Sequence, residues 1–133
     1  MHPLLRLTLA IIAGIVISFF VIVLFEGLNA KLYPSKILHP TIQEIILEMK
    51  GLPIQAFLIV LLGYILSSFM GGYLAARIAY DKHKLYAGLT VGFVLLLGGI
   101  VNFVSIPHPL WVSISACLSF ILFAYLGSRM AIR

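Results

Sequence analysis

The sequence predicts an all-α membrane protein, a four-transmembrane-helix bundle with a short amphipathic helix in the first external loop. Hydrophobic residues make up 62% of the 133 residues and charged residues only 10%, whereas soluble domains carry roughly 25% charged residues. Four apolar stretches reach the roughly 20 residues that a helix needs to cross a bilayer. No charged residue or histidine lies in the middle of any of them. We therefore expect a single transmembrane domain over residues 1–133, with the lipid bilayer around it.

The first span is predicted from Leu4 to Phe25. Its apolar run is longer than the core of a signal peptide, which has about 7–15 residues, so we interpret it as an uncleaved helix. Gly14 and Ser18 are its only glycine and serine, and much of its surface is therefore expected to face lipid. Glu26 is expected to mark its outer end, and residues 29–39 are expected to form a loop.

A short amphipathic helix is predicted over residues 41–50, outside the membrane. Thr41 and Glu44 have the spacing of a capping box, in which each side chain satisfies a backbone N–H at the start of a helix. Apolar residues follow at one-face spacing: Ile42, Ile45, Ile46 and Met49. The polar face carries Glu44 and Glu48, whereas helices that bind anionic lipid are rich in Lys and Arg. We expect the helix to pack on the mouth of the bundle rather than adhere to lipid or capture a partner.

The second span, Ile54 to Ile78, is predicted to be the core helix of the bundle. Small residues recur at every fourth position along it: Gly63, Ser67, Gly71, Ala75 and Ala79. A second row of small residues runs beside the first: Ser68, Gly72 and Ala76. In lipid, helices associate by close backbone contact through small residues. The two rows offer such contact along most of the span.

The third span, Leu85 to Val104, is rich in glycine. Four of its residues share one face of the helix, which we expect to pack on the second span: Gly88, Gly92, Gly99 and Asn102. The turn Pro107-His108-Pro109 then ends one helix and precedes the next. The fourth span is predicted from Leu110 to Met130, with Trp111 at the outer membrane interface.

An octet at the end of the second span is repeated at the end of the fourth. Residues 72–79, Gly-Tyr-Leu-Ala-Ala-Arg-Ile-Ala, align without gaps with residues 124–131, Ala-Tyr-Leu-Gly-Ser-Arg-Met-Ala. Two explanations stay open. One is the duplication of a helical hairpin. The other is a tight packing site, with an arginine that reaches the interface, that arose twice.

The basic residues predict the orientation. The chain carries a net charge of +5, but no basic face with interleaved aromatic residues indicates nucleic-acid binding. One side of the four-span arrangement carries Arg6, Arg77, Lys82, Lys84, Arg129 and Arg133, and the other carries Lys31, Lys36 and Lys50. By the positive-inside rule, we expect both termini and the second loop in the cytoplasm.

Candidate chemistry is sparse. Ion-coupled transport and intramembrane catalysis usually need an ionisable group at membrane depth, and the middles of the spans have none. Asn102 is expected to hydrogen-bond across helices, or else to form a polar site with His108. The outer-face residues Glu26, His39, Glu44, Glu48 and His108 lack the spacing of a local metal motif, and we expect no metal, cofactor or catalytic residues. Cys117 is expected to be a packing residue.

Three of these segments together resemble small uncharacterised bacterial integral membrane proteins with four spans: residues 71–79, residues 98–102, and the Pro-His-Pro-Leu-Trp turn at 107–111. The resemblance covers residues 53–127 and implies the four-span architecture and a location in the bacterial inner (cytoplasmic) membrane. It implies no catalytic activity.

These observations favour a non-enzymatic membrane protein of structural or accessory type. Self-association and a membrane-protein partner are both open. The alternative is a small transporter or channel-like protein for an uncharged or apolar compound, which would need a cavity rather than a charge relay. An enzyme with an outer-face site at His39 or His108 is the least favoured class.

Overall fold

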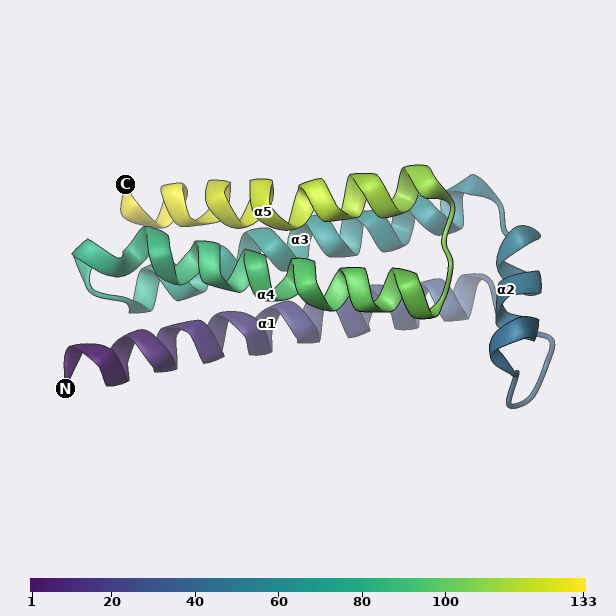
Figure 1. Cartoon of the computed structure of the whole chain (residues 1–133), viewed down its shortest axis with the longest axis horizontal. Helices are drawn as coiled ribbons and strands as arrows, with labels where there is room; N and C mark the ends of the chain where they lie inside the picture. Colours follow the sequence, from purple (N-terminus) through teal and green to yellow (C-terminus); the bar gives the residue numbers. More distant parts are fainter.

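The computed structural model describes all 133 residues and confirms the bundle of four helices that are long and apolar enough to cross a membrane. The elements are α1 (Pro3–Leu32), α2 (Ile42–Lys50), α3 (Ile54–Ile78), the 3-10 turn η1 (Asp81–His83), α4 (Lys84–Ser105) and α5 (Leu110–Ile132). The four long helices lie side by side, α2 lies across one end, and both termini lie at the opposite end (Figure 1). Following the expected topology, we name these the outer and inner ends.

α1 is longer than the sequence predicted, because it continues past Phe25 to Leu32. The single glycine in this extension costs a helix only about 1 kcal/mol, and no proline follows until Pro34. The Tyr33 N–H closes the helix by donating to the Asn29 carbonyl at 2.8 Å. The expected loop therefore begins after Leu32.

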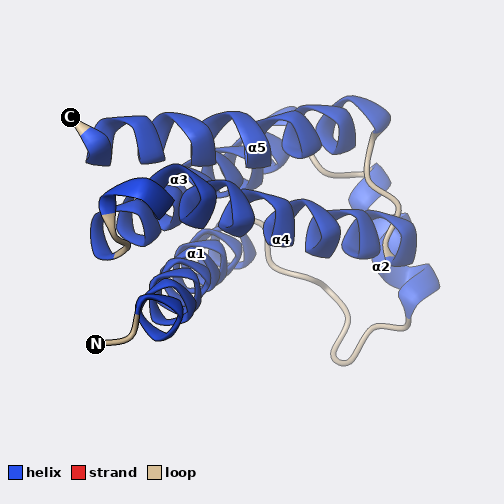
Figure 2. Cartoon of the chain, turned by 60° about the vertical axis from the view of Figure 1, so that its left-hand side comes forward, coloured by secondary structure: helices blue, strands red, loops and turns tan.

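α2 begins with the predicted capping box. The Thr41 N–H donates to the Glu44 carboxylate at 2.7 Å, and the Glu44 N–H lies 3.4 Å from the Thr41 hydroxyl. These bonds to Thr41 lower the pKa of Glu44. Glu48 holds the preceding loop against the helix, because its carboxylate accepts the Ser35 hydroxyl at 2.7 Å and the Lys36 N–H at 3.0 Å. The loop and α2 thus form one layer over the outer end (Figure 2).

α3 lies against all three other long helices, most extensively α5 and α1. Its first row of small residues faces α1. A Cβ on Gly14 would lie 2.7 Å from the Gly71 carbonyl oxygen, and one on Gly63 would lie 2.8 Å from the Phe25 ring. The Ser18 hydroxyl donates to the Ser67 carbonyl at 2.9 Å. α1 is the least buried span, yet its Gly14 and Ser18 pack closely against α3.

The second row of small residues faces α5. A Cβ on Gly72 would lie 2.8 Å from the Ala124 Cα, and the Ser128 hydroxyl contacts the Gly72 carbonyl at 3.3 Å. Both helices run from the outer to the inner end, so the two similar octets are parallel and lie at the same depth. In each octet the same four positions are buried: Gly72, Ala75, Ala76 and Ala79, and Ala124, Gly127, Ser128 and Ala131. A shared contact accounts for their similarity without requiring duplication.

The glycine face of α4 contacts α5, and not chiefly α3 as the sequence analysis expected. A Cβ on Gly92 would lie 2.6 Å from the Ala124 Cβ, and one on Gly99 would clash with the Phe120 ring. Gly88 lies between α5 and α3, because a Cβ there would meet Ser128 and would lie 2.9 Å from the Gly72 carbonyl oxygen. α4 accordingly packs more extensively on α5 than on α3.

Arg6 ties α1 to the inner end of α3. Its guanidinium donates to the Ile78 carbonyl at 2.5 Å and lies 4.1 Å from the centre of the Tyr80 ring. The cation therefore satisfies a carbonyl that the end of α3 leaves free. The Tyr80 hydroxyl donates in turn to the Met1 carbonyl at 3.2 Å.

Candidate functional site

The small residues singled out by the sequence all lie at contacts between helices. Gly63, Ser67, Gly71 and Ala75 lie on α3 where it meets α1, and Gly88, Gly92 and Gly99 lie on α4 where it meets α5. These positions build the bundle, and Gly99 also lines a pocket.

A pocket of about 370 Å³ lies between α1 and α4 in the outer half of the bundle. α1 and α4 pack against each other less than either packs against α3, which leaves this space. Apolar side chains line its two walls: Ile15, Phe19, Ile22 and Val23 on α1, and Val94 and Leu95 on α4. Tyr64 of α3 and Phe120 of α5 also line it, with their ring centres 5.4 Å apart. Its volume falls in the range of about 300–1,000 Å³ typical of small-molecule sites.

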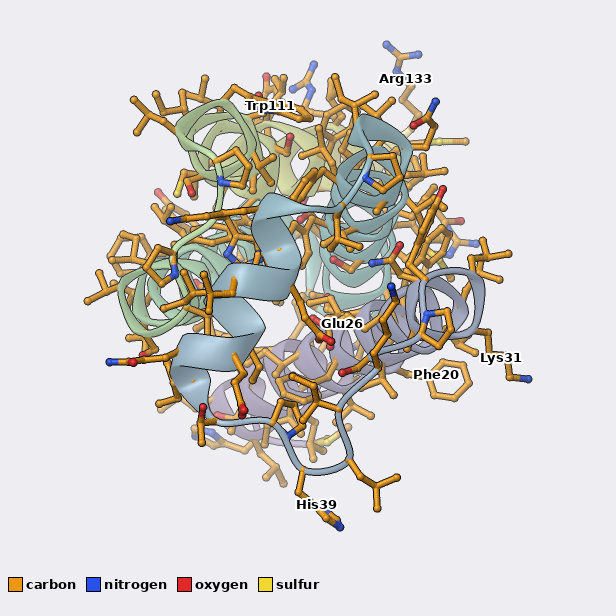
Figure 3. The ribbon with its side chains drawn as sticks, turned by 90° about the vertical axis from the view of Figure 1, so that its right-hand side faces the viewer. Phe20, Glu26, Lys31, His39, Trp111 and Arg133 are labelled. Carbon is orange, nitrogen blue, oxygen red and sulfur yellow. The ribbon has the colours of Figure 1, made fainter.

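Three polar side chains line this pocket: Glu26, Tyr64 and Asn102. In the view onto the outer end, Glu26 lies near the middle of the bundle beside α2, whereas Lys31 and Phe20 project outward (Figure 3). Tyr64 is 5% exposed. The pocket thus combines apolar walls with a few polar groups, the composition typical of ligand sites.

Asn102 and His108 do not form one polar site. Asn102 lines the pocket between α1 and α4, whereas His108 lines a separate pocket of about 470 Å³ between α4 and α5, together with Cys117. The Asn102 side chain makes no hydrogen bond to another helix; the side-chain hydrogen bonds between the long helices come from Arg6, Ser18 and Ser128.

His108 is a structural residue of the turn between α4 and α5. Its Nδ1 lies 2.7 Å from the Ile106 carbonyl oxygen, and its ring meets the Phe103 ring edge-on at 5.0 Å. Burial lowers the pKa of His108, and the contact with the Ile106 carbonyl opposes this in part. The imidazole is therefore neutral at pH 7.

The outer-face carboxylates and histidines do not gather into a metal site. No group of three His, Cys, Asp or Glu side chains lies close enough to hold a metal ion. Glu44 and Glu48 are engaged in the cap of α2 and in its loop. His39 lies at the tip of that loop, away from Glu26 (Figure 3), and has a positive φ of 61°.

Sequence reasoning missed the pocket and two of its polar residues. Glu26 is the only acidic residue in the four long helices, which is a usable signal, but its position after the first apolar run predicts only the end of a span. Tyr64 gave no signal, because a tyrosine among apolar residues resembles any other aromatic packing residue.

In comparisons with protein-family models, curated proteins and solved structures, the chain matches none. The site is therefore interpreted from its own geometry.

Proposed function

We propose that this chain is a structural or accessory component of the bacterial inner (cytoplasmic) membrane, without enzymatic activity, and that both termini lie in the cytoplasm. In this role the chain would assemble either with further copies of itself or with another membrane protein.

The packing of the inner half carries the proposal. Gly14 meets Gly71, and Gly72 meets Ala124, at distances that leave no room for a Cβ. α3 is thereby in backbone contact with α1 and with α5 at the same depth. A compound that crosses the membrane through the bundle needs a passage beside α3, and these contacts occupy that position.

The charges support the orientation. The inner end carries six arginines and lysines with Asp81 as its only acid, and the outer end carries three lysines balanced by three glutamates. Such an excess of Lys and Arg is typical of cytoplasmic loops and termini. A phosphatase reporter that becomes active when fused after Arg133, but not when inserted after Lys36, would contradict this orientation.

The alternative, a transporter for an uncharged or apolar compound, draws its support from the pocket between α1 and α4. That pocket is lined from Ile15 to Glu26 on α1 and does not include the inner contacts at Gly14 and Gly71. A transporter would have to separate these glycines in each cycle.

Solute flux distinguishes the two functions. We expect liposomes that contain the purified protein to take up glycerol and urea at the rate of protein-free liposomes, measured by light scattering after rapid mixing. Protein-dependent uptake that Gly14→Leu abolishes would refute the structural role and favour transport. Liposomes with Gly27→Leu serve as the matched control, because a side chain at Gly27 meets nothing within 4 Å.

A further inference from the structure

The outer end of α1 presents a carboxylate without a cation. Glu26 makes no ion pair, since the one ion pair in the structure joins Lys84 to Asp81 at the inner end. The nearest lysine along α1, Lys31, projects away from Glu26 (Figure 3). One helical turn beyond Glu26, the side-chain oxygen of Asn29 is buried with no hydrogen-bond partner. Glu26 and Asn29 are thus two side-chain acceptors at this end of α1 that the protein leaves without a partner.

Tyr64 adds a buried polar group that faces the same pocket. The residue is 95% buried, since only 5% of it is exposed, and its hydroxyl makes no hydrogen bond, although its backbone carbonyl accepts two from Ser67 and Ser68. The ring is enclosed by the helices, and the side chain lines the pocket. The hydroxyl is therefore free to hydrogen-bond to a ligand in the pocket.

We propose that the pocket between α1 and α4 binds an amphiphile that has an ammonium head and an apolar chain. The head lies among Glu26, Tyr64 and Asn102, and the chain lies along Phe19, Val94 and Phe120. This inference goes beyond the proposed structural role, because it assigns a ligand class to one site.

The head is cationic because of the groups that meet it. An ammonium group has three N–H donors and no acceptor, which matches the carboxylate of Glu26, the hydroxyl oxygen of Tyr64 and the carboxamide oxygen of Asn102. An anionic head would be repelled by Glu26, and no basic side chain lines the pocket.

The apolar chain of the proposed ligand has the length of a chain in one leaflet of the bilayer. The α1 wall runs from Ile15 to Glu26, which is eleven steps along the helix, or about 17 Å at 1.5 Å per residue. This is about half of the roughly 30 Å hydrocarbon core. A chain held there with its head at Glu26 has the position of a lipid chain in the outer leaflet. Its source is either an ethanolamine phospholipid of that leaflet or a free lipophilic amine.

The test compares two probes of equal chain length. Dodecylamine, which is protonated at pH 7 as lysine is, and uncharged dodecanol are added at equal mole fraction to the protein in maltoside micelles, and bound adducts are counted by native mass spectrometry. We expect one dodecylamine per chain, bound at least about tenfold more tightly than dodecanol, as for a charge-assisted hydrogen bond. In Glu26→Gln the two probes should bind equally.

A pair of glycine variants tests the location. Gly98 lines the pocket and Gly27 does not, and a side chain at either meets nothing within 4 Å. Gly98→Leu should weaken dodecylamine binding at least tenfold, and Gly27→Leu should leave it unchanged. Equal binding of dodecylamine and dodecanol to the wild type, or wild-type binding by a folded Gly98→Leu, would overturn the proposal. If Gly98→Leu does not fold, the proposal is tested by comparing dodecylamine and dodecanol binding to the wild type and to Glu26→Gln.

A third measurement distinguishes an ethanolamine phospholipid from a free lipophilic amine as the ligand. A phospholipid with an ethanolamine head replaces dodecylamine in the same measurement. Binding that depends on Glu26 assigns the site to a lipid of the bilayer, whereas binding of dodecylamine alone assigns it to a free amine. Failure of every amine would leave the solute-flux result, and with it the proposed structural role, unaffected.

Discussion

Gly72→Ala should separate α5 from α3 even though it adds only one methyl group. The added Cβ would lie 2.8 Å from the Ala124 Cα and closer still to the Ala124 carbonyl oxygen. Carbon atoms prefer a separation of about 3.5–4.0 Å, so α5 must retreat by about 1 Å, and a gap of that size forfeits a quarter to a half of each dispersion contact. The atoms met are backbone atoms, which cannot rotate away. Overpacking of this kind costs about 1–3 kcal/mol.

Gly98→Ala is the matched control. A side chain at Gly98 meets nothing within 4 Å, so this variant gains the helix preference of alanine over glycine, about 0.5–1 kcal/mol, with no clash. Both changes lie inside transmembrane helices and carry the same gain, which cancels when the two are compared. The difference between the variants therefore measures overpacking alone.

The assay is unfolding by dodecyl sulfate in maltoside micelles, followed by far-ultraviolet circular dichroism and by the fluorescence of Trp111. We expect Gly72→Ala to have a free energy of unfolding lower than that of Gly98→Ala by about 1–3 kcal/mol. Two variants that unfold at the same dodecyl sulfate fraction would refute the backbone contact between α3 and α5. Gly72→Leu should enlarge the difference, because a longer side chain forces a wider separation.

Three further outcomes follow from particular contacts. Asn102→Leu should change the free energy of unfolding by less than about 1 kcal/mol, because the side chain spans no helix pair, whereas a larger loss would reveal a cross-helix bond. Ser18→Ala should cost about 0.6 kcal/mol in the same assay, because it removes the hydroxyl that bonds Ser67, and a loss no larger than experimental error would contradict that bond. Acidification from pH 7.5 to 5.5 should lower the melting temperature of the wild type more than that of His108→Gln. Burial lowers the pKa of His108 in the folded protein, so the unfolded chain, in which the histidine pKa is about 6.5, binds more protons as the pH falls. An equal fall in melting temperature for the two proteins would show that His108 does not cause the effect.

The fold was predictable because each span satisfies a local requirement. Apolar length alone defines a membrane helix, and α3 has the predicted bounds, Ile54–Ile78. The capping box at Thr41 and Glu44 likewise depends only on residues three positions apart. α1 was predicted too short because its end is set by the Tyr33 N–H and the Asn29 carbonyl outside the apolar run, where hydropathy carries no information.

Helix partners were less predictable than helices. A row of small residues shows that something approaches closely, but any second row of small residues would fit it equally well. The sequence therefore assigns the glycines of α4 to α3, whereas Gly92 and Gly99 contact α5 and only Gly88 also meets α3. The pocket was beyond prediction for the same reason, because it exists only where α1 and α4 separate.

The sizes of the residues along α3 explain why the helices pack closely in the inner half of the bundle, whereas the outer half contains a pocket. Toward the inner end, Gly71 and Gly72 let neighbouring backbones touch. Toward the outer end, Tyr64 stands between the helices and meets the rings of Phe103 and Phe120, with ring centres 6.2 and 5.4 Å apart. Aromatic rings of this size hold helices apart, and the space between α1 and α4 beside Glu26 remains as a pocket. The change from small residues near the inner end of α3 to a large ring near its outer end therefore accounts for both the close packing and the pocket. A lipid-binding role and a structural role are thus compatible in one chain.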